Sequence, residues 1–293
     1  MTPLSILLVL SSALIHSSWN FFTKRGNWPV KFFLWVFLWG TLLYLPFFIG
    51  FGIFPAFLLN FPSKLWLLAI LSSLIQTIYV ISLIEAYRVG DLSLVYPISR
   101  SAPLFTQIWA ILFLGEDLSI RGMLGIGLVV LGIFVISLKA FPMKKLNSHS
   151  QPIASASYLL ASIAAITGSI YSVIDKVAVQ ITHPVFYIWL TDFLIFLYIG
   201  LYLLFRKGDS CWKIWNESRK EIFMIVLLQN ASYLLILMAM QMSKVSYVVA
   251  FRQVSALFGT GLGILFLKES QWKTRISGAL ILTLGLILIG LAK

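Results

Sequence analysis

Long segments without a charged side chain limit the fold of this chain more than any other feature. No Asp, Glu, Lys or Arg occurs in residues 32–63, 65–84, 122–138, 146–174, 222–243 and 276–292. A helix that spans a bilayer needs about 20 mostly apolar residues, and several of these segments reach that length. Charged residues make up 11% of the whole chain, against about 25% in an ordinary soluble domain. The sequence therefore predicts a protein that crosses a lipid bilayer many times.

The apolar segments have the pattern of helices rather than that of an outer-membrane β-barrel. Strands of such a barrel alternate apolar and polar residues over about ten positions. Segments such as ILLVL, LLILMAM and LILTLGLILIGL do not alternate. Inside lipid, where no water is present to satisfy the backbone, helices are then the remaining solution. We therefore predict an all-α membrane protein.

Ten transmembrane helices fit the chain, with short connections between most of them. We expect them at about 3–22, 32–54, 65–87, 92–114, 121–139, 152–174, 184–205, 221–241, 245–267 and 274–292. A longer connection at the midpoint divides the chain into halves of five helices. The expected organisation is a first repeat at 1–140, a linker at 141–151 and a second repeat at 152–293.

The two halves repeat each other in sequence. Residues 86–100, AYRVGDLSLVYPISR, align with residues 239–253, AMQMSKVSYVVAFRQ. Residues 112–132 align with residues 265–285 at the same offset of 153. Because each half has five helices, an odd number, the second half must enter the membrane in the opposite sense. The sequence thus predicts two inverted five-helix repeats.

Positive charges are unevenly divided between the two sides of the predicted bundle. The loops after helices 1, 3, 5, 7 and 9 hold fifteen Lys and Arg residues, and the other side holds five. Cytoplasmic loops carry the excess of positive charge, so we place these loops in the cytoplasm and both termini outside, in the cell (inner) membrane. Since the positive charge lies in short loops, the net charge of +12 does not indicate nucleic-acid binding.

Several local motifs resemble the EamA-domain proteins of the drug/metabolite transporter superfamily. They are LIHSSWNFFTKRG (14–26), GDLSLVYPISRSAP (90–103), LFLGEDLS (112–119) and the glycine-rich GMLGIGLVVLGIFVISL (122–138). The resemblance extends over nearly the whole chain and implies two inverted five-helix repeats around a central cavity. Members that resemble this chain export amino acids, metabolites or drugs, so the resemblance implies a transporter and leaves the substrate open.

One functional residue of the similar small multidrug resistance transporters is missing from this chain. Those proteins carry a membrane-embedded Glu on the first helix, eight residues before a Lys. Counting back eight residues from Lys24 and from Lys176 gives His16 and Gly168. The coupling role of that Glu in the small multidrug resistance transporters therefore cannot be assigned to a residue at the same position of this chain. Many relatives are also thought to keep their termini in the cytoplasm, which is the reverse of the orientation that the charges predict.

Polar side chains inside the predicted spans are candidates for a transport site, because their burial in lipid is costly. Two polar stripes follow helical spacing, one on the first helix (Ser12, His16, Trp19, Asn20, Thr23) and one on the sixth (Gly168, Tyr171, Ser172, Asp175). If the stripes face each other, they line a wet cavity at the centre of the bundle. Alternatively, their side chains only hold neighbouring helices together by hydrogen bonds.

Arg100 and Arg252 lie at matching places inside the fourth and ninth helices. An Arg at the depth of a bilayer costs at least about 2.5–3.5 kcal/mol and needs a partner. We expect one or both guanidinium groups to contact an anionic part of the substrate. The alternatives are a structural ion pair with Glu85 or Asp192, or a side chain that reaches the membrane surface.

The full set of expected substrate-binding residues combines these polar groups with amide and aromatic side chains. It comprises His16, Trp19, Asn20, Gln76, Tyr96, Arg100, Tyr171, Asp192, Gln229 and Arg252. The two glutamines occupy equivalent sites in the two halves, and the aromatic side chains could stack on a ligand.

Three groups are candidates for binding a coupling ion: Asp192, Glu85 and His16. Asp192 is the deeper of the two acids, near the middle of the seventh helix. His16 could take a proton near neutral pH, or serve as a neutral hydrogen-bonded side chain. Glu85 could instead pair with Arg88, one turn further along its helix.

We expect a secondary active transporter, and specifically an exporter, that moves a small metabolite, amino acid or drug-like compound by alternating access. The alternative is a polytopic membrane enzyme that acts on a lipid or lipid-linked substrate. The sequence has no H-E-x-x-H, G-x-S-x-G or Walker motif, so we predict no catalytic residue, no metal and no cofactor. The expected partners are the lipid bilayer, the small-molecule substrate and a coupling proton, and glycine-rich helices would also permit a homodimer.

Overall fold

The computed structural model describes residues 1–26, 28–50, 62–90, 92–137, 151–205, 210–258 and 272–292. This part of the chain is helical throughout and contains no strand. Five of its helices are long and apolar enough to cross a membrane, and three further apolar helices are shorter. The prediction of an all-α, multi-pass membrane protein is therefore confirmed.

The helices follow the predicted spans closely. They are α1 (Pro3–Gly26), α2 (Val30–Gly50), α4 (Ser63–Val89), α5 (Leu92–Ser99), α6 (Ala102–Leu114), α7 (Ile120–Ser137), α8 (Gln151–Ile181), α9 (Pro184–Leu204), α10 (Cys211–Met242), α11 (Val245–Phe251), the 3-10 helix η2 (Arg252–Val254) and α13 (Trp272–Gly290). The predicted ends at 51–54, 138–139 and 259–267 lie outside the described residues, as does all of the linker except Gln151.

The predicted fourth helix is interrupted in its middle. α5 ends at Ser99 and α6 begins at Ala102, with Arg100 between them. Pro103 is the reason on the α6 side, since it has no N–H to offer to the carbonyl of Ser99 and its ring crowds the preceding turn. The predicted ninth helix also changes at its arginine, where α11 tightens into η2. The second half has Ala250 at the position that matches Pro97. There α11 continues directly into η2, without the two non-helical residues that separate α5 from α6.

Two helices are longer than predicted. α8 continues through Asp175 and Lys176 to Ile181, because both of these charged side chains find partners inside the bundle. α10 begins at Cys211, where the hydroxyl of Ser210 accepts the N–H of Trp212 at 3.2 Å and caps the helix. Non-helical dihedral angles at Ser218 then bend α10 near the place where a separate span was expected.

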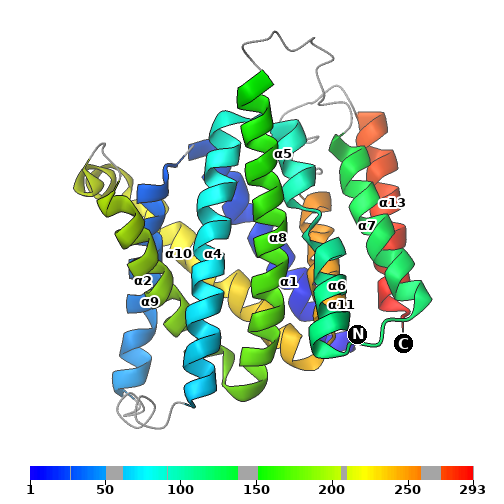
Figure 1. Ribbon diagram of the computed structural model, residues 1–293, viewed down its shortest axis with the longest axis horizontal. Helices are drawn as coiled ribbons and strands as arrows, with labels where there is room; N and C mark the ends of the chain where they lie inside the picture. Colours follow the sequence, from blue (N-terminus) through cyan, green and yellow to red (C-terminus); the bar gives the residue numbers. More distant parts are fainter. Residues whose placement is uncertain are drawn as a thin grey trace.

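The bundle is built from neighbouring helix pairs (Figure 1). α4 packs on α8, α7 on α13, α1 on α10 and α2 on α9. In the picture the α7–α13 pair forms one flank of the molecule, and α2, α9 and α10 form the opposite flank. Both chain ends lie at the same end of the bundle. An even number of crossings requires this placement, whichever side of the membrane that end faces.

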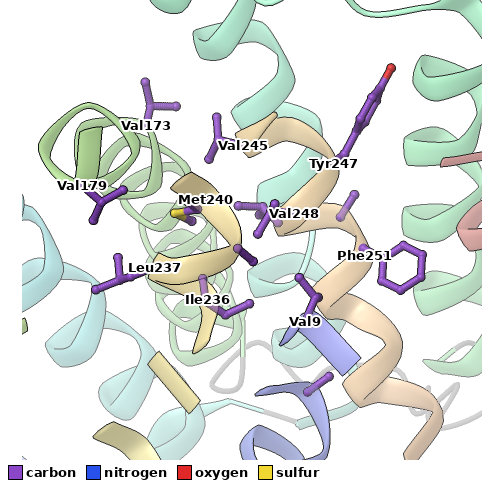
Figure 2. Packing of buried hydrophobic residues seen from close by; sticks show 14 of the residues in the cluster. Val9, Val173, Val179, Ile236, Leu237, Met240, Val245, Tyr247, Val248 and Phe251 are labelled. Carbon is purple, nitrogen blue, oxygen red and sulfur yellow. The ribbon is translucent and has the colours of Figure 1, made fainter. Parts of the chain in front are cut away.

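One apolar cluster fills the centre where α1, α8, α10 and α11 converge (Figure 2). Its members include Val9, Val173, Val179, Ile236, Leu237, Met240, Val245, Val248 and Phe251. Large apolar side chains on the outer surfaces of α1, α8 and α10 are exposed, as expected for helices in contact with lipid, whereas every residue of α11 is buried. The core therefore fixes the ends of α10 and α11, which bring Arg252 toward α1.

Candidate functional site

Both intramembrane arginines converge on one histidine. Nη1 of Arg100 lies 3.1 Å from Nε2 of His16, and Nη2 of Arg252 lies 3.1 Å from Nδ1 of the same ring. The indole N–H of Trp19 also points at Nδ1, at 3.0 Å. His16 is 5% exposed, so this group of four side chains, hereafter the arginine–histidine cluster, lies inside the bundle.

The arginine–histidine cluster has more hydrogen-bond donors than acceptors. A guanidinium group only donates, and a neutral imidazole accepts at one of its two nitrogens. The ring of His16 therefore satisfies the donors on one side only, although guanidinium groups approach it from both sides. Nε of Arg252 has no partner at all. A ligand that brings oxygen acceptors would satisfy these N–H groups.

No carboxylate neutralises these arginines among the described residues. The ion pair found there joins Arg88 to Glu85, whose two oxygens each lie 3.1 Å from Nη1 of Arg88. Ion pairs from Arg100 or Arg252 to Glu85 or Asp192, the structural alternative, do not form in this part of the chain. The two guanidinium groups are also close enough to repel each other. Arg100 directly follows the C-terminus of α5, where carbonyl groups attract cations, whereas at Arg252 the chain continues into η2.

Aromatic rings surround the arginine–histidine cluster. The guanidinium carbon of Arg100 lies 5.2 Å from the centre of the Tyr96 ring, within range of a cation–π contact. Tyr79 and Tyr171 meet edge to face with their centres 5.5 Å apart, and both act electrostatically on the two arginines. Of the predicted site residues, the fold thus brings together His16, Trp19, Tyr96, Arg100, Tyr171 and Arg252.

Three other predicted site residues, Asn20, Gln76 and Gln229, lie on α1, α4 and α10. The amide of Asn20 donates to the backbone carbonyl of His16 at 2.7 Å, within its own helix. Gln76 is buried and donates to the hydroxyl of Ser72 at 3.0 Å. Gln229 is half-buried on α10. The polar stripe of α1 also divides, because Ser12 bonds the hydroxyl and carbonyl of Ser232 on α10 and so joins two helices.

Sequence reasoning placed Asp175 on a polar stripe and did not include it among the membrane acids. The structure shows it fully buried and bonded by three hydroxyl groups from three other helices. Ser72 donates to Oδ1 at 2.5 Å, Tyr187 donates to the same oxygen at 2.6 Å, and Tyr233 donates to Oδ2. Both oxygens are thus occupied, as suits an ionised carboxylate. The missed signal was the length of the sixth helix, which extends past residue 174.

The comparisons with known proteins agree with this architecture. A model of the EamA-like transporter family matches residues 3–138 and again residues 155–291. The chain belongs to the EamA-like transporter family. This confirms the resemblance drawn from the motifs and makes the protein a multi-pass membrane transporter of the drug/metabolite transporter superfamily. Members of the family are transporters and not enzymes.

Two individual proteins give narrower comparisons. Over 76 residues the chain is 36% identical to an uncharacterized protein of Methanocaldococcus jannaschii, a match that covers 26% of this chain and 56% of that protein. The chain thus spans little more than half the length of this curated relative. This chain also superposes on a crystal structure of another protein, with a TM-score of 0.74 and 15% sequence identity. The superposition covers 98% of this chain and 96% of the other chain. This second similarity is one of fold alone.

Two turns are joined by hydrogen bonds at one end of the EamA bundle. Glu116, in the turn between α6 and α7, accepts the N–H of Val245 at 2.6 Å and the hydroxyl of Ser246 at 2.7 Å, which caps α11. Lys244 donates in return to the carbonyl of Asp117. We call this set of residues the turn latch; it consists of Glu116, Asp117, Lys244, Val245 and Ser246. The latch lies at the end of the bundle where the chain termini lie (Figure 1).

Further bonds fasten the same end. Lys176 donates to the carbonyls of Met240 and Ser243, the latter at 3.1 Å, and so covers the C-terminus of α10. Ser243 bonds Ser5 of α1 through their hydroxyl groups at 2.7 Å. At the C-terminal end of α1, by contrast, there is a cavity of about 320 Å³. It is lined by Phe22, Gly26, Trp28, Glu221, Met224 and Ile225.

Proposed function

We propose that this protein is a secondary active transporter of a small metabolite with an anionic group, and that Arg100, His16 and Arg252 bind that group. The observation that carries the proposal is the meeting of two guanidinium groups at one imidazole, with no carboxylate of the described residues in an ion pair with either group. A carboxylate or phosphate accepts several N–H bonds from a guanidinium group in a fixed, planar geometry. Tyr79, Tyr96 and Tyr171 would hold the remainder of a small organic molecule.

The proposed mechanism is alternating access between two inverted five-helix repeats. Support comes from the way in which α7 and α13 pack against each other. A Cβ atom added to Gly125 would meet Gly285, and one added to Gly132 would meet Gly278, so the two helices run antiparallel. Broken helices at a central site are common in transporters built from inverted repeats. Here the interruptions occur at Arg100 and Arg252.

The contrast between the two ends of the bundle supports a direction of transport. The turn latch joins two turns at the end with the termini, and the cavity between α1 and α10 lies at the other end. The distribution of positive charge favours a cytoplasmic location for the end with the cavity. A site that is loaded from the cytoplasm suits an exporter, which is the direction we propose, with a proton as the coupling ion.

Flux measurements in sealed vesicles test the proposed substrate class. Purified protein in proteoliposomes should transport, or be inhibited by, members of a panel of small carboxylates and phosphate esters. Neutral and cationic compounds of equal size should have at least about tenfold weaker effects, because each charged hydrogen bond contributes about 1.5–3 kcal/mol. Transport of cations alone, with no effect of any anion, would contradict the proposal.

Removing the carboxylate of the turn latch should open the closed end. We expect Glu116→Gln to increase the labelling rate of a buried cysteine, Val248→Cys, by about tenfold in a Cys211→Ser background. The reason is the loss of a charged helix cap, worth about 1.5 kcal/mol. The measurement is the rate of reaction with a membrane-impermeant maleimide. Glu217→Gln, at an exposed position on α10, serves as the control and should leave the rate unchanged; equal rates in both variants would argue against a latch.

A further inference from the structure

A second buried acid, Asp192, lies in a polar site separate from the arginine–histidine cluster. It projects from α9 toward α2 and α10 and is 3% exposed. Gly40 of α2 leaves the space that its carboxyl occupies, because a Cβ atom there would collide with Oδ2 of Asp192 and lie 3.0 Å from Nδ2 of Asn230. The site is therefore formed by three helices around one carboxyl group.

Two acceptor oxygens in this site have no donor. The side chain of Asn230 lies beside Asp192 at Gly40, and its Nδ2 donates to the carbonyl of Val226 at 3.1 Å. Oδ2 of Asp192 and Oδ1 of Asn230 are both buried without a partner. A buried oxygen that lacks a donor costs about 1–3 kcal/mol, and more if it carries charge. An ionised Asp192 would therefore be strongly unfavourable as it stands.

The groups that face Asp192 offer no positive charge. From α2 the acid meets Tyr44, with which it interacts electrostatically, and from α10 it meets the neutral Asn230. On the α4 side, the hydroxyl of Ser73 is directed to the carbonyl of Thr191 at 3.4 Å. On the α8 side, Asp175 is engaged by Tyr187 of α9. Within the described residues, no lysine or arginine forms an ion pair with Asp192.

We propose that Oδ2 of Asp192 binds a proton, and that this is the site of the coupling ion. Uptake of one proton from water forms an O–H bond, removes the negative charge and converts an unpaired acceptor into a donor. The neutral form needs no counter-ion, which matches a site without one. A metal cation such as Na⁺ would need several more oxygen ligands than these two orphan acceptors supply.

The contrast with Asp175 separates a proton site from a structural carboxylate. Asp175 receives three O–H donors, so its ionised form is stabilised, whereas Oδ2 of Asp192 is buried without a hydrogen-bond donor. The assignment of the proton depends only on these contacts. Its role in coupling rests on the proposed transport function, so the two statements can be tested apart.

Infrared spectroscopy of the protein in liposomes at neutral pH, with no substrate added, tests the proton directly. We expect a carbonyl stretching band of a protonated carboxyl group that is absent in Asp192→Asn and retained in Asp175→Asn. The Asn variant reproduces the shape and charge of the protonated acid, so it should keep the melting temperature of the wild type. Addition of Na⁺ should leave the band unchanged.

Two results would overturn the proposal: a band that persists in Asp192→Asn, or a band that Na⁺ abolishes, since the latter would make this a metal-cation site. If Asp192→Asn does not fold, Asp192→Glu provides the test, because it must shift the band frequency while Asp175→Glu does not. Anion flux in proteoliposomes is measured separately, so a failure of the proton site and a failure of the proposed transport function give different results.

Discussion

Replacement of Arg252 by Gln is expected to abolish transport of the anionic substrate while leaving the protein folded. Gln is neutral and cannot form the paired N–H bonds of a guanidinium group. Each lost charged hydrogen bond costs about 1.5–3 kcal/mol, so affinity should fall by at least about tenfold and by more than about a hundredfold if both bonds are lost. Within the part of the chain that the structure describes, the guanidinium has no carboxylate partner and its Nε has no acceptor, so its removal should keep or raise the melting temperature.

The measurement is the initial rate of flux in proteoliposomes, with the thermal unfolding temperature in detergent recorded for the same samples. Arg100→Gln should behave in the same way, because it contacts the other nitrogen of His16. Arg88→Gln is the matched control, since this arginine is exposed and paired with Glu85 near the C-terminal end of α4. A variant of Arg252 that transports at the rate of the wild type would show that the arginine–histidine cluster does not bind substrate.

The largest loss of stability is expected at the contact between α7 and α13. A Cβ atom at Gly132 would lie 2.6 Å from both the Cβ and the backbone nitrogen of Leu282, and 2.8 Å from the carbonyl of Gly278. Backbone atoms cannot rotate away, so Gly132→Val must push the two helices apart. Close approach through small residues holds membrane helices together. We expect a destabilisation of about 3 kcal/mol or more, at or beyond the upper end of the usual range for overpacking.

Thermal unfolding and the yield of monodisperse protein report this effect. Gly127→Val is the control on the same helix, because a Cβ atom there meets nothing within 4 Å. It should keep the melting temperature of the wild type. Equal stability of the two variants would mean that α7 and α13 do not pack at the distance described.

The sequence predicted the helices well, and Pro97 and Pro103 indicated a kink in the fourth helix beside Arg100, whereas the change at Arg252 was not predicted. Segments without charge must be helical in lipid, because water is not there to satisfy the backbone, and this holds whatever their neighbours are. The break at Arg100 depended on how Pro103 acts within a particular helix, and proline kinks vary with their surroundings. The tightening at Arg252 has no proline nearby, so the sequence held no local signal for it.

In the candidate site, too, the sequence identified some of the residues, and only the packing of the helices decided which of them meet. The cost of an arginine in a bilayer identified Arg100 and Arg252 before any fold was known. Their common partner, His16, lies far from both in sequence, and only helix packing joins the three. The orientation in the membrane, the homodimer and the proton coupling remain predictions.

The sequence by itself determined that this is an all-helical membrane protein of the EamA-like family, because the length and apolarity of its segments leave one solution in lipid and its motifs are carried by short stretches of chain. The tertiary structure decided which polar groups meet. It surrounded Asp175 with three hydroxyl groups, left an oxygen of Asp192 without a donor, and set two arginines against one histidine. These differences arise from contacts between helices far apart in the chain, and no local pattern records the distance between them.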